Sequence, residues 1–144
     1  MEDCKDIKLK RGDKIMDGQI WYEYVSDDSD MLILHIKTDG IMLSATAHDC
    51  FSALIDVRNQ LEEINIYPLI MGAHQKVYPS PMQQSMGDGR NAYLQRMGNP
   101  ALQSDCVDIF DPCNVDDVSS IAAQEQYHNR WIADARDRYR ELHP

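Results

Sequence analysis

Three short runs rich in β-branched and aromatic residues lie in the first third of the chain. They cover residues 19–25, 31–37 and 41–44, and this composition favours β-strands. Residues 26–30 have the composition of a turn, and Asp39-Gly40 supplies the positive φ that a tight hairpin requires. The pattern therefore predicts an antiparallel meander of three strands.

Two capping signatures predict two main helices. Thr46 and Asp49 have the spacing of a capping box. The helix that follows is expected to run to about residue 64, with an amphipathic face formed by Phe51, Leu54, Ile55, Arg58 and Leu61. Asn114 to Asp117 is the second signature, and its helix is expected to run to about Leu142. Its apolar stripe, expected to pack, is Val118, Ile121, Ala122, Ile132, Ala135, Tyr139 and Leu142.

Two further short runs complete the predicted sheet. Residues 66–71 form a strand that is expected at an edge, because Pro68 cannot donate a hydrogen bond to a neighbouring strand. Residues 106–110 alternate apolar and acidic positions. The sequence thus predicts an α+β fold, an antiparallel sheet of about five strands with two main helices packed on it, in a single domain over residues 1–144.

Residues 72–100 show no sustained helical or strand period, and their local charge is positive in an acidic chain. Their aromatic and methionine side chains indicate an ordered segment packed on the sheet. Within it, Met86-Gly-Asp-Gly-Arg90 is typical of a tight turn, with a phosphate-binding loop as the alternative, and residues 91–97 predict a short helix. A candidate anion site in this segment consists of His74, Arg90 and Arg96.

The chain has a formal net charge of −10, and its acids are unevenly distributed. Two clusters are expected to face solvent, because unpaired buried carboxylates are costly. Phosphate backbones are repelled by such surfaces, so nucleic-acid binding is disfavoured, whereas a cationic protein partner would be attracted by steering. A solvated, solubilising face is the alternative. The candidate partner-binding residues are Asp27, Asp28, Asp30, Asp105, Asp108 and Asp111.

Motifs for catalysis, metal binding or cofactor binding are missing from the sequence. It contains no P-loop, GxGxxG, Cys-x2-Cys or His-Glu-x-x-His pattern, so no metal and no cofactor are predicted. Cys50 follows His48 by two residues, but this helical spacing points the two side chains in different directions. A small buried cysteine is therefore expected there rather than a nucleophile.

The sequence shows neither an apolar leader at its N-terminus nor a run of about twenty apolar residues. No membrane association is predicted, and the four cysteines are expected to be free thiols in a reducing cytoplasm.

In size and in its acidic runs at residues 27–30 and 105–117, the chain resembles immunity proteins of bacterial contact-dependent inhibition and polymorphic toxin systems. That resemblance implies a toxin-neutralising protein that binds and occludes a basic toxin domain, such as a nuclease, and it favours a binding role over an enzymatic one. The alternative is a small enzyme or ligand-binding domain with its anion site in residues 72–100.

Overall fold

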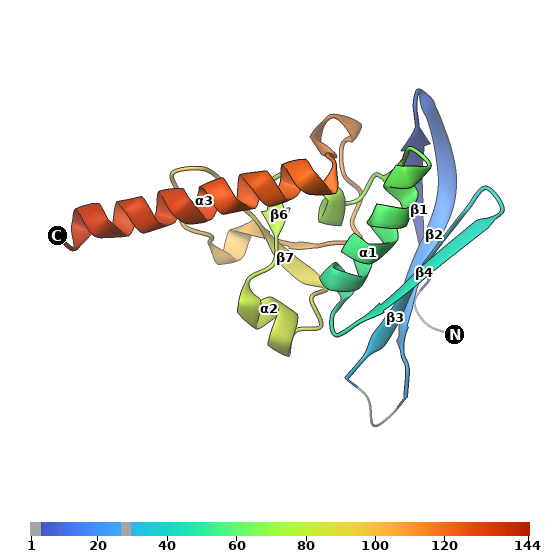
Figure 1. The fold of residues 1–144 in the computed structure, drawn as a ribbon, viewed down its shortest axis with the longest axis horizontal. Helices are drawn as coiled ribbons and strands as arrows, with labels where there is room; N and C mark the ends of the chain where they lie inside the picture. The colour runs from blue at the N-terminus through green and yellow to red at the C-terminus, as the bar shows by residue number, and fades with distance from the viewer. Residues whose placement is uncertain (1–3, 27–29) are drawn as a thin grey trace.

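A computed structural model describes residues 4–26 and 30–144, and its largest element is a five-stranded sheet with the order β4-β3-β2-β1-β5 (Figure 1). All neighbouring strands pair antiparallel. This confirms the predicted α+β class with an antiparallel sheet of about five strands. The strand predicted at residues 106–110 lies in a second sheet instead, and an unpredicted strand at Lys5–Arg11 takes its place in the first. The strands are β1 (Lys5–Arg11), β2 (Lys14–Tyr24), β3 (Leu32–Thr38), β4 (Ile41–Ala47) and β5 (Ile66–Pro68).

The first hairpin of this sheet was not predicted. β1 is a strand in which only Ile7 and Leu9 face the core, between charged residues that point outward. β2 begins at Lys14, five positions before the predicted strand. Its first half was missed because it, too, buries only alternate side chains. The predicted hairpin at Asp39-Gly40 and the edge position of β5 are both confirmed.

Helix α1 (Cys50–Glu63) covers one face of this sheet and lies against β3, β4 and β5. The predicted capping box is wrong, because Thr46 belongs to β4. Asp49 is the N-cap, and its carboxylate accepts hydrogen bonds from the backbone N–H and the hydroxyl of Ser52. The amphipathic face of α1 is buried as expected, with Phe51 and Leu54 almost inaccessible.

Residues 72–100 are more regular than predicted. A second antiparallel sheet has the order β6-β7-β8, and the expected helix at residues 91–97 is instead strand β7, whose Ala92 is buried opposite Val107. Packing of the segment on the core is confirmed, because Val77 and Ala92 join one hydrophobic cluster with the first sheet. The expected contribution of the methionines is wrong, because Met82, Met86 and Met97 are 69%, 81% and 42% exposed. The elements of this half are η1 (Met71–Ala73), β6 (Val77–Tyr78), α2 (Pro81–Met86), β7 (Asn91–Leu94), η2 (Gln103–Asp105), β8 (Cys106–Asp108) and η3 (Val115–Asp117).

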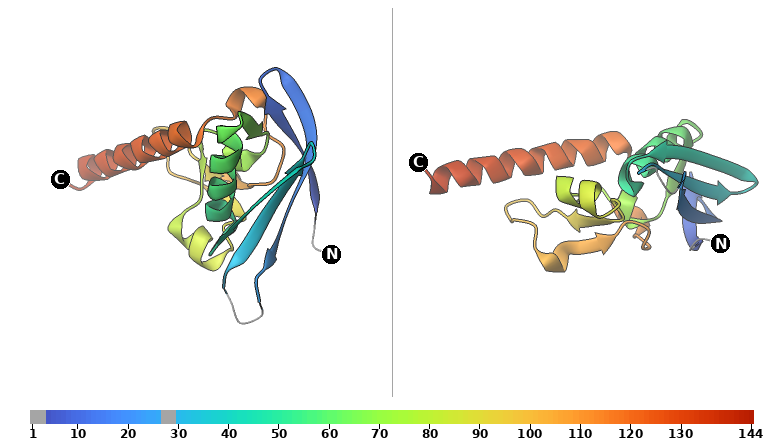
Figure 2. Two further views of the ribbon diagram at one scale, coloured as in Figure 1. Left: turned by 45° about the vertical axis from the view of Figure 1, so that its right-hand side comes forward. Right: turned by 90° about the horizontal axis from the view of Figure 1, so that it is seen from below.

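The last helix, α3 (Ile121–Leu142), begins later than predicted. Asn114 caps the short helix η3, and Ser120 caps α3. α3 packs against β6 and α1 with its first turns and then projects from the body (Figures 1 and 2). The predicted packing of its distal apolar stripe is therefore wrong: Tyr139 is 63% and Leu142 77% exposed.

A buried polar network fixes the start of α3. The guanidinium of Arg58, which is fully buried on α1, donates to Gln124 Oε1 at 2.6 Å and to Ser119 O at 3.0 Å. Gln124 Nε2 donates in turn to the carbonyls of Gly72 and Val77. Because buried polar groups need partners, this network sets how α3 sits on the body.

Candidate functional site

Residues of the two sites predicted from the sequence pair with each other in part. Arg96 forms an ion pair with Asp105 at 2.8 Å, and Arg90 forms one with Asp108 at 2.7 Å. The third acid of this group, Asp111, pairs with Lys5 at 2.8 Å. The acids of residues 105–111 are thus neutralised within the molecule.

The prediction that these acids face solvent is wrong for Asp105 and Asp108, whose side chains are 4% and 30% exposed. Each carboxylate also accepts a hydrogen bond from a nearby backbone N–H. Asp105 accepts from the N–H of Leu102, and Asp108 accepts from the N–H of Phe110. Their burial is tolerated because opposite charge and hydrogen bonds replace water.

The predicted anion site does not assemble. Arg90 stacks on the Phe110 ring, with its guanidinium carbon 4.1 Å from the ring centroid. His74 lies 3.8 Å from Asp117, and its Nδ1 accepts from the N–H of Lys76. Burial lowers the pKa of His74, against the opposing attraction of Asp117. Arg90, Arg96 and His74 thus face three different carboxylates rather than one shared site.

A second group of acids remains open at the end of the β2–β3 hairpin, where that hairpin meets α2 and the turn after it. A depression of about 340 Å³ lies there, and we name it the acidic recess. Asp30, with a side chain 86% exposed, belongs to it, whereas Asp27 and Asp28 lie outside the described residues. Its lining is Tyr24, Asp30, His48, Gln84, Ser85, Met86 and Asp88.

A tight turn at residues 87–89 carries Asp88 into the recess, which confirms the turn interpretation of this motif. Asp88 has φ +62° and Gly89 φ +66°. The carbonyl of Asp88 accepts from the N–H of Cys50 at 2.6 Å, so the turn docks on the start of α1. A Cβ at Gly89 would lie 2.5 Å from Oδ1 of Asp49, and glycine is therefore required.

Tyr24 connects the hairpin to this turn. Its phenol donates to the carboxylate of Asp88, and this hydrogen bond, with burial, raises the pKa of Tyr24 well above its ordinary value. His48 lies 3.5 Å from Asp30 at the same mouth. The recess therefore holds two exposed carboxylates, and none of the described residues that line it is Lys or Arg.

The segments that form the recess carry exposed apolar side chains, of which Tyr24 and Met86 line it. Tyr24 is 47%, Val25 56%, Met82 69% and Met86 81% exposed. Tyrosine and methionine are enriched in protein interfaces, and clustered exposed apolar groups mark such surfaces. Sequence reasoning noted Asp30 but missed Tyr24 and Asp88, and a helix as short as α2 leaves its methionines without a core to enter.

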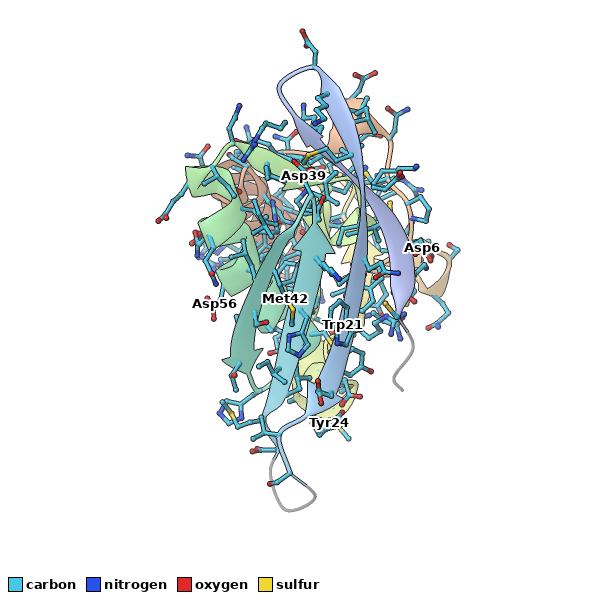
Figure 3. All side chains as sticks on the ribbon, turned by 90° about the vertical axis from the view of Figure 1, so that its right-hand side faces the viewer. Asp6, Trp21, Tyr24, Asp39, Met42 and Asp56 are labelled. Atoms are coloured by element: carbon cyan, nitrogen blue, oxygen red, sulfur yellow. The ribbon has the colours of Figure 1, made fainter. Side chains whose placement is uncertain are left out.

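The outer face of the first sheet carries a chain of polar side chains near Trp21 (Figure 3). The ring of His35 stacks on that of Trp21, with 5.0 Å between the ring centroids. Its Nδ1 is hydrogen-bonded to Ser44 Oγ at 2.6 Å, and its Nε2 to Glu23 Oε2 at 3.1 Å. Acyl-transfer chemistry would also need a substrate pocket and oxyanion donors. Neither the acidic recess nor the larger groove described next is lined by His35, Ser44 or Glu23.

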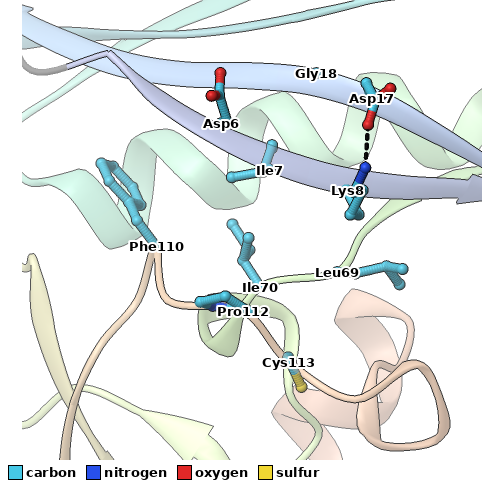
Figure 4. A pocket seen from close by; sticks show the side chains of 10 residues that line it. All are labelled: Asp6, Ile7, Lys8, Asp17, Gly18, Leu69, Ile70, Phe110, Pro112 and Cys113. Carbon is cyan, nitrogen blue, oxygen red and sulfur yellow. Dashed lines mark hydrogen bonds and ion pairs between the residues drawn. The ribbon is translucent and has the colours of Figure 1, made fainter.

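Another cavity lies beside β1 and has a volume of about 560 Å³ (Figure 4). We name it the β1 groove. Its apolar lining comes from Ile7, Leu69, Ile70, Phe110 and Pro112, and its other lining residues are Asp6, Lys8, Asp17, Gly18 and Cys113.

The cysteines offer little nucleophilic chemistry. All four are free, and burial raises the pKa of Cys50 to about 12 and that of Cys113 to about 11. Both thiols are thus protonated at neutral pH, and the thiolate is the nucleophile. The predicted burial of Cys50 is confirmed.

Within residues 4–26 and 30–144, no group of three or more His, Cys, Asp or Glu side chains is arranged to hold a metal ion. In the same part of the chain, none of the helices combines the length and apolar character that a bilayer span needs. No known protein family matches the sequence, and no curated protein is significantly similar to it.

Proposed function

We propose that this protein is a cytoplasmic immunity protein that neutralises a toxin by binding and occluding its basic domain through the acidic recess. The proposal rests on one observation: in the described part of the chain, carboxylates without a Lys or Arg partner and exposed tyrosine and methionine side chains share one surface. Among the described residues that line the recess, no Lys or Arg neutralises Asp30 and Asp88, while Tyr24 and Met86 are exposed beside them.

The physical basis is complementary charge followed by apolar contact. The chain carries −10 formal charge, so its field attracts a cationic domain and raises the association rate. At contact, a Lys or Arg side chain of the partner can enter the recess between Asp30 and Asp88. Tyrosine and methionine side chains around it then supply buried area, which is where the binding energy of interfaces concentrates.

A toxin encoded next to the gene of this protein provides the experiment. The purified basic domain of that toxin is titrated with this protein and with the double variant Asp30→Asn, Asp88→Asn. Asparagine is well tolerated at a positive φ, so the turn at Asp88 keeps its conformation. The variant is expected to bind at least about tenfold more weakly, with slower association and a smaller dependence on salt.

The matched control is Asp56→Asn, Glu63→Gln, which removes the same charge from the exposed side of α1. It should change the association rate only slightly and leave dissociation unchanged. Equal losses in the two double variants would reduce the effect to net charge and contradict a role for the recess. Unchanged binding in the Asp30, Asp88 variant would contradict it as well.

A further inference from the structure

Strand β1 has a free edge over its first half. β5 pairs with it only from Leu9 to Arg11, and the N–H of Leu69 donates to Lys8 O just beyond. The two-residue turn after Arg11 makes Arg11 and Lys14 a hydrogen-bonded pair. Alternation along the ladder then directs the N–H and C=O of Asp6, and the N–H of Lys8, away from β2. In the described chain, no backbone hydrogen bond from outside the sheet reaches Asp6.

The β1 groove runs along this free edge. β1 forms one side of it, and the segment with Phe110, Pro112 and Cys113 forms the other (Figure 4). Ile7 and Ile70, which are 6% and 0% exposed, also line the groove. An unpaired strand edge beside an apolar groove is the arrangement in which proteins bind extended peptides, with main-chain hydrogen bonds on the edge and alternate side chains in the groove.

The charges along the edge favour a basic peptide. Lys8 is paired with Asp17, and Lys5 with Asp111. Asp6 accepts a hydrogen bond from the amide of Gln19 at 3.3 Å, and no ion pair engages it within the described residues. After these pairings a single negative charge remains on the edge, at Asp6.

We propose that the free edge of β1 binds an extended segment of a protein partner by strand addition, and that this segment alternates apolar with basic residues. Its apolar side chains enter the β1 groove, and its basic side chains lie along the rim near Asp6. The inference depends on the proposed function only in giving the partner a positive charge. It concerns a different surface from the acidic recess and is tested without the toxin.

The probe is a capped peptide of about six residues, the usual length of a strand, in which lysine and valine alternate. Titration followed by NMR is expected to shift the resonances of residues 5–8 and of the 110–113 segment. Amide exchange should slow at Asp6 and Lys8, whose N–H groups point outward. It should not change at Ile7, which already pairs with Gly18.

Asp6→Pro removes the edge donor without touching the β1–β2 ladder and is expected to weaken binding about tenfold. Met42→Pro is the matched control at the outer edge of β4, where the N–H also points away from the sheet. It should leave binding unchanged, and melting curves show whether both variants stay folded. Asp6→Asn, which keeps the backbone donor and removes the charge, should weaken binding only about twofold. If Asp6→Pro does not fold, a peptide with alternate amides N-methylated tests the edge contact on the unchanged protein.

Three results would overturn the inference. One is equal binding of the same peptide with alternate amides N-methylated, because such a peptide keeps its charge but cannot pair as a strand. The second is a set of shifts confined to Asp30, Asp88 and their neighbours, which would assign the peptide to the acidic recess. The third is no binding at millimolar peptide. The first and third outcomes leave toxin binding by the recess untouched, whereas the second would support it.

Discussion

The acids of residues 105–111 and the acids around Tyr24 look alike in the sequence but face different surroundings. Asp105 and Asp108 are held by Arg96 and Arg90 and cap nearby backbone. Asp30 and Asp88 line an open recess, to which the described residues contribute no Lys or Arg. The first group therefore serves mainly the fold, whereas the second is available to a partner.

This difference teaches that an acidic run is a binding surface only where the fold brings no cation to it. Arg90 and Arg96 lie in a locally basic segment, and pairing of β7 with β8 places that segment beside the acids. Arg90 and Arg96 of one candidate site and Asp105 and Asp108 of the other thus belong to one structural arrangement. The tests below compare the two groups of acids, from the largest expected effect to the smallest.

Gly89→Ala should cause the largest loss of stability, because it disrupts the turn that presents Asp88. The positive φ costs roughly 1 kcal/mol, and the clash with Asp49 endangers the cap of α1, for a total of about 2–4 kcal/mol. Urea unfolding measures this. Gly12→Ala is the control, with a similar φ of +59° and nothing within 4 Å, and should cost only about 1 kcal/mol. Equal losses would show that the turn does not depend on its contact with α1.

The double variant Asp105→Asn, Asp108→Asn should lower the free energy of unfolding by about 2–3 kcal/mol. Hydrogen bonds to charged groups contribute about 1.5–3 kcal/mol each, and we discount the Arg96 pair because that side chain is 59% exposed. The melting temperature should fall by roughly 5–10 °C. Asp116→Asn, an exposed acid nearby, is the control. A loss below about 0.5 kcal/mol would contradict the structural role of the first group.

Acid should destabilise the protein through His74 and His128, because burial lowers the pKa of both. Protonation then favours the unfolded chain. The stability from these groups is complete above the ordinary histidine pKa of about 6.5 and is lost as the pH falls through the lowered value in the folded state. The melting temperature should fall as the pH is lowered from about 7.5 to 5.5, and the melting temperature of the His74→Gln variant should fall less over the same range. Equal slopes would show that Asp117 offsets the burial of His74.

Asp30→Asn with Asp88→Asn should have the smallest effect on stability, within about 0.5 kcal/mol of the unchanged protein. Exposed charges contribute little to folding, and asparagine tolerates the positive φ at Asp88. Chemical denaturation measures this value. A loss above about 1.5 kcal/mol would mean that the recess acids hold the hairpin to the turn through Tyr24 and are structural after all.

Local sequence patterns predicted much of the fold. The hairpin at Asp39-Gly40, the edge position of β5 and the length of α1 follow from residues that act on their immediate neighbours. β1 was missed because two buried side chains between lysines give a weak alternating signal. Residues 91–97 were predicted as a helix, but pairing with β8 overrides local preference there.

The candidate site could be predicted only in part. The turn at residues 87–89 was readable from its glycines, and the exposure of Asp30 from its acidic surroundings. The meeting of Tyr24 with Asp88 depends on a contact between residues far apart in the chain. The neutralisation of Asp105 and Asp108 depends on the pairing of β7 with β8. Local patterns carry no information on either contact.

The most direct test measures stability and toxin binding together for the two charge-matched double variants. We expect Asp30→Asn, Asp88→Asn to keep the stability and lose at least about tenfold in affinity. We expect Asp105→Asn, Asp108→Asn to lose stability, while its folded fraction keeps nearly the original affinity. The reverse pattern, with binding lost only in the Asp105, Asp108 variant at conditions where it is folded, would contradict the assignment of the acidic recess.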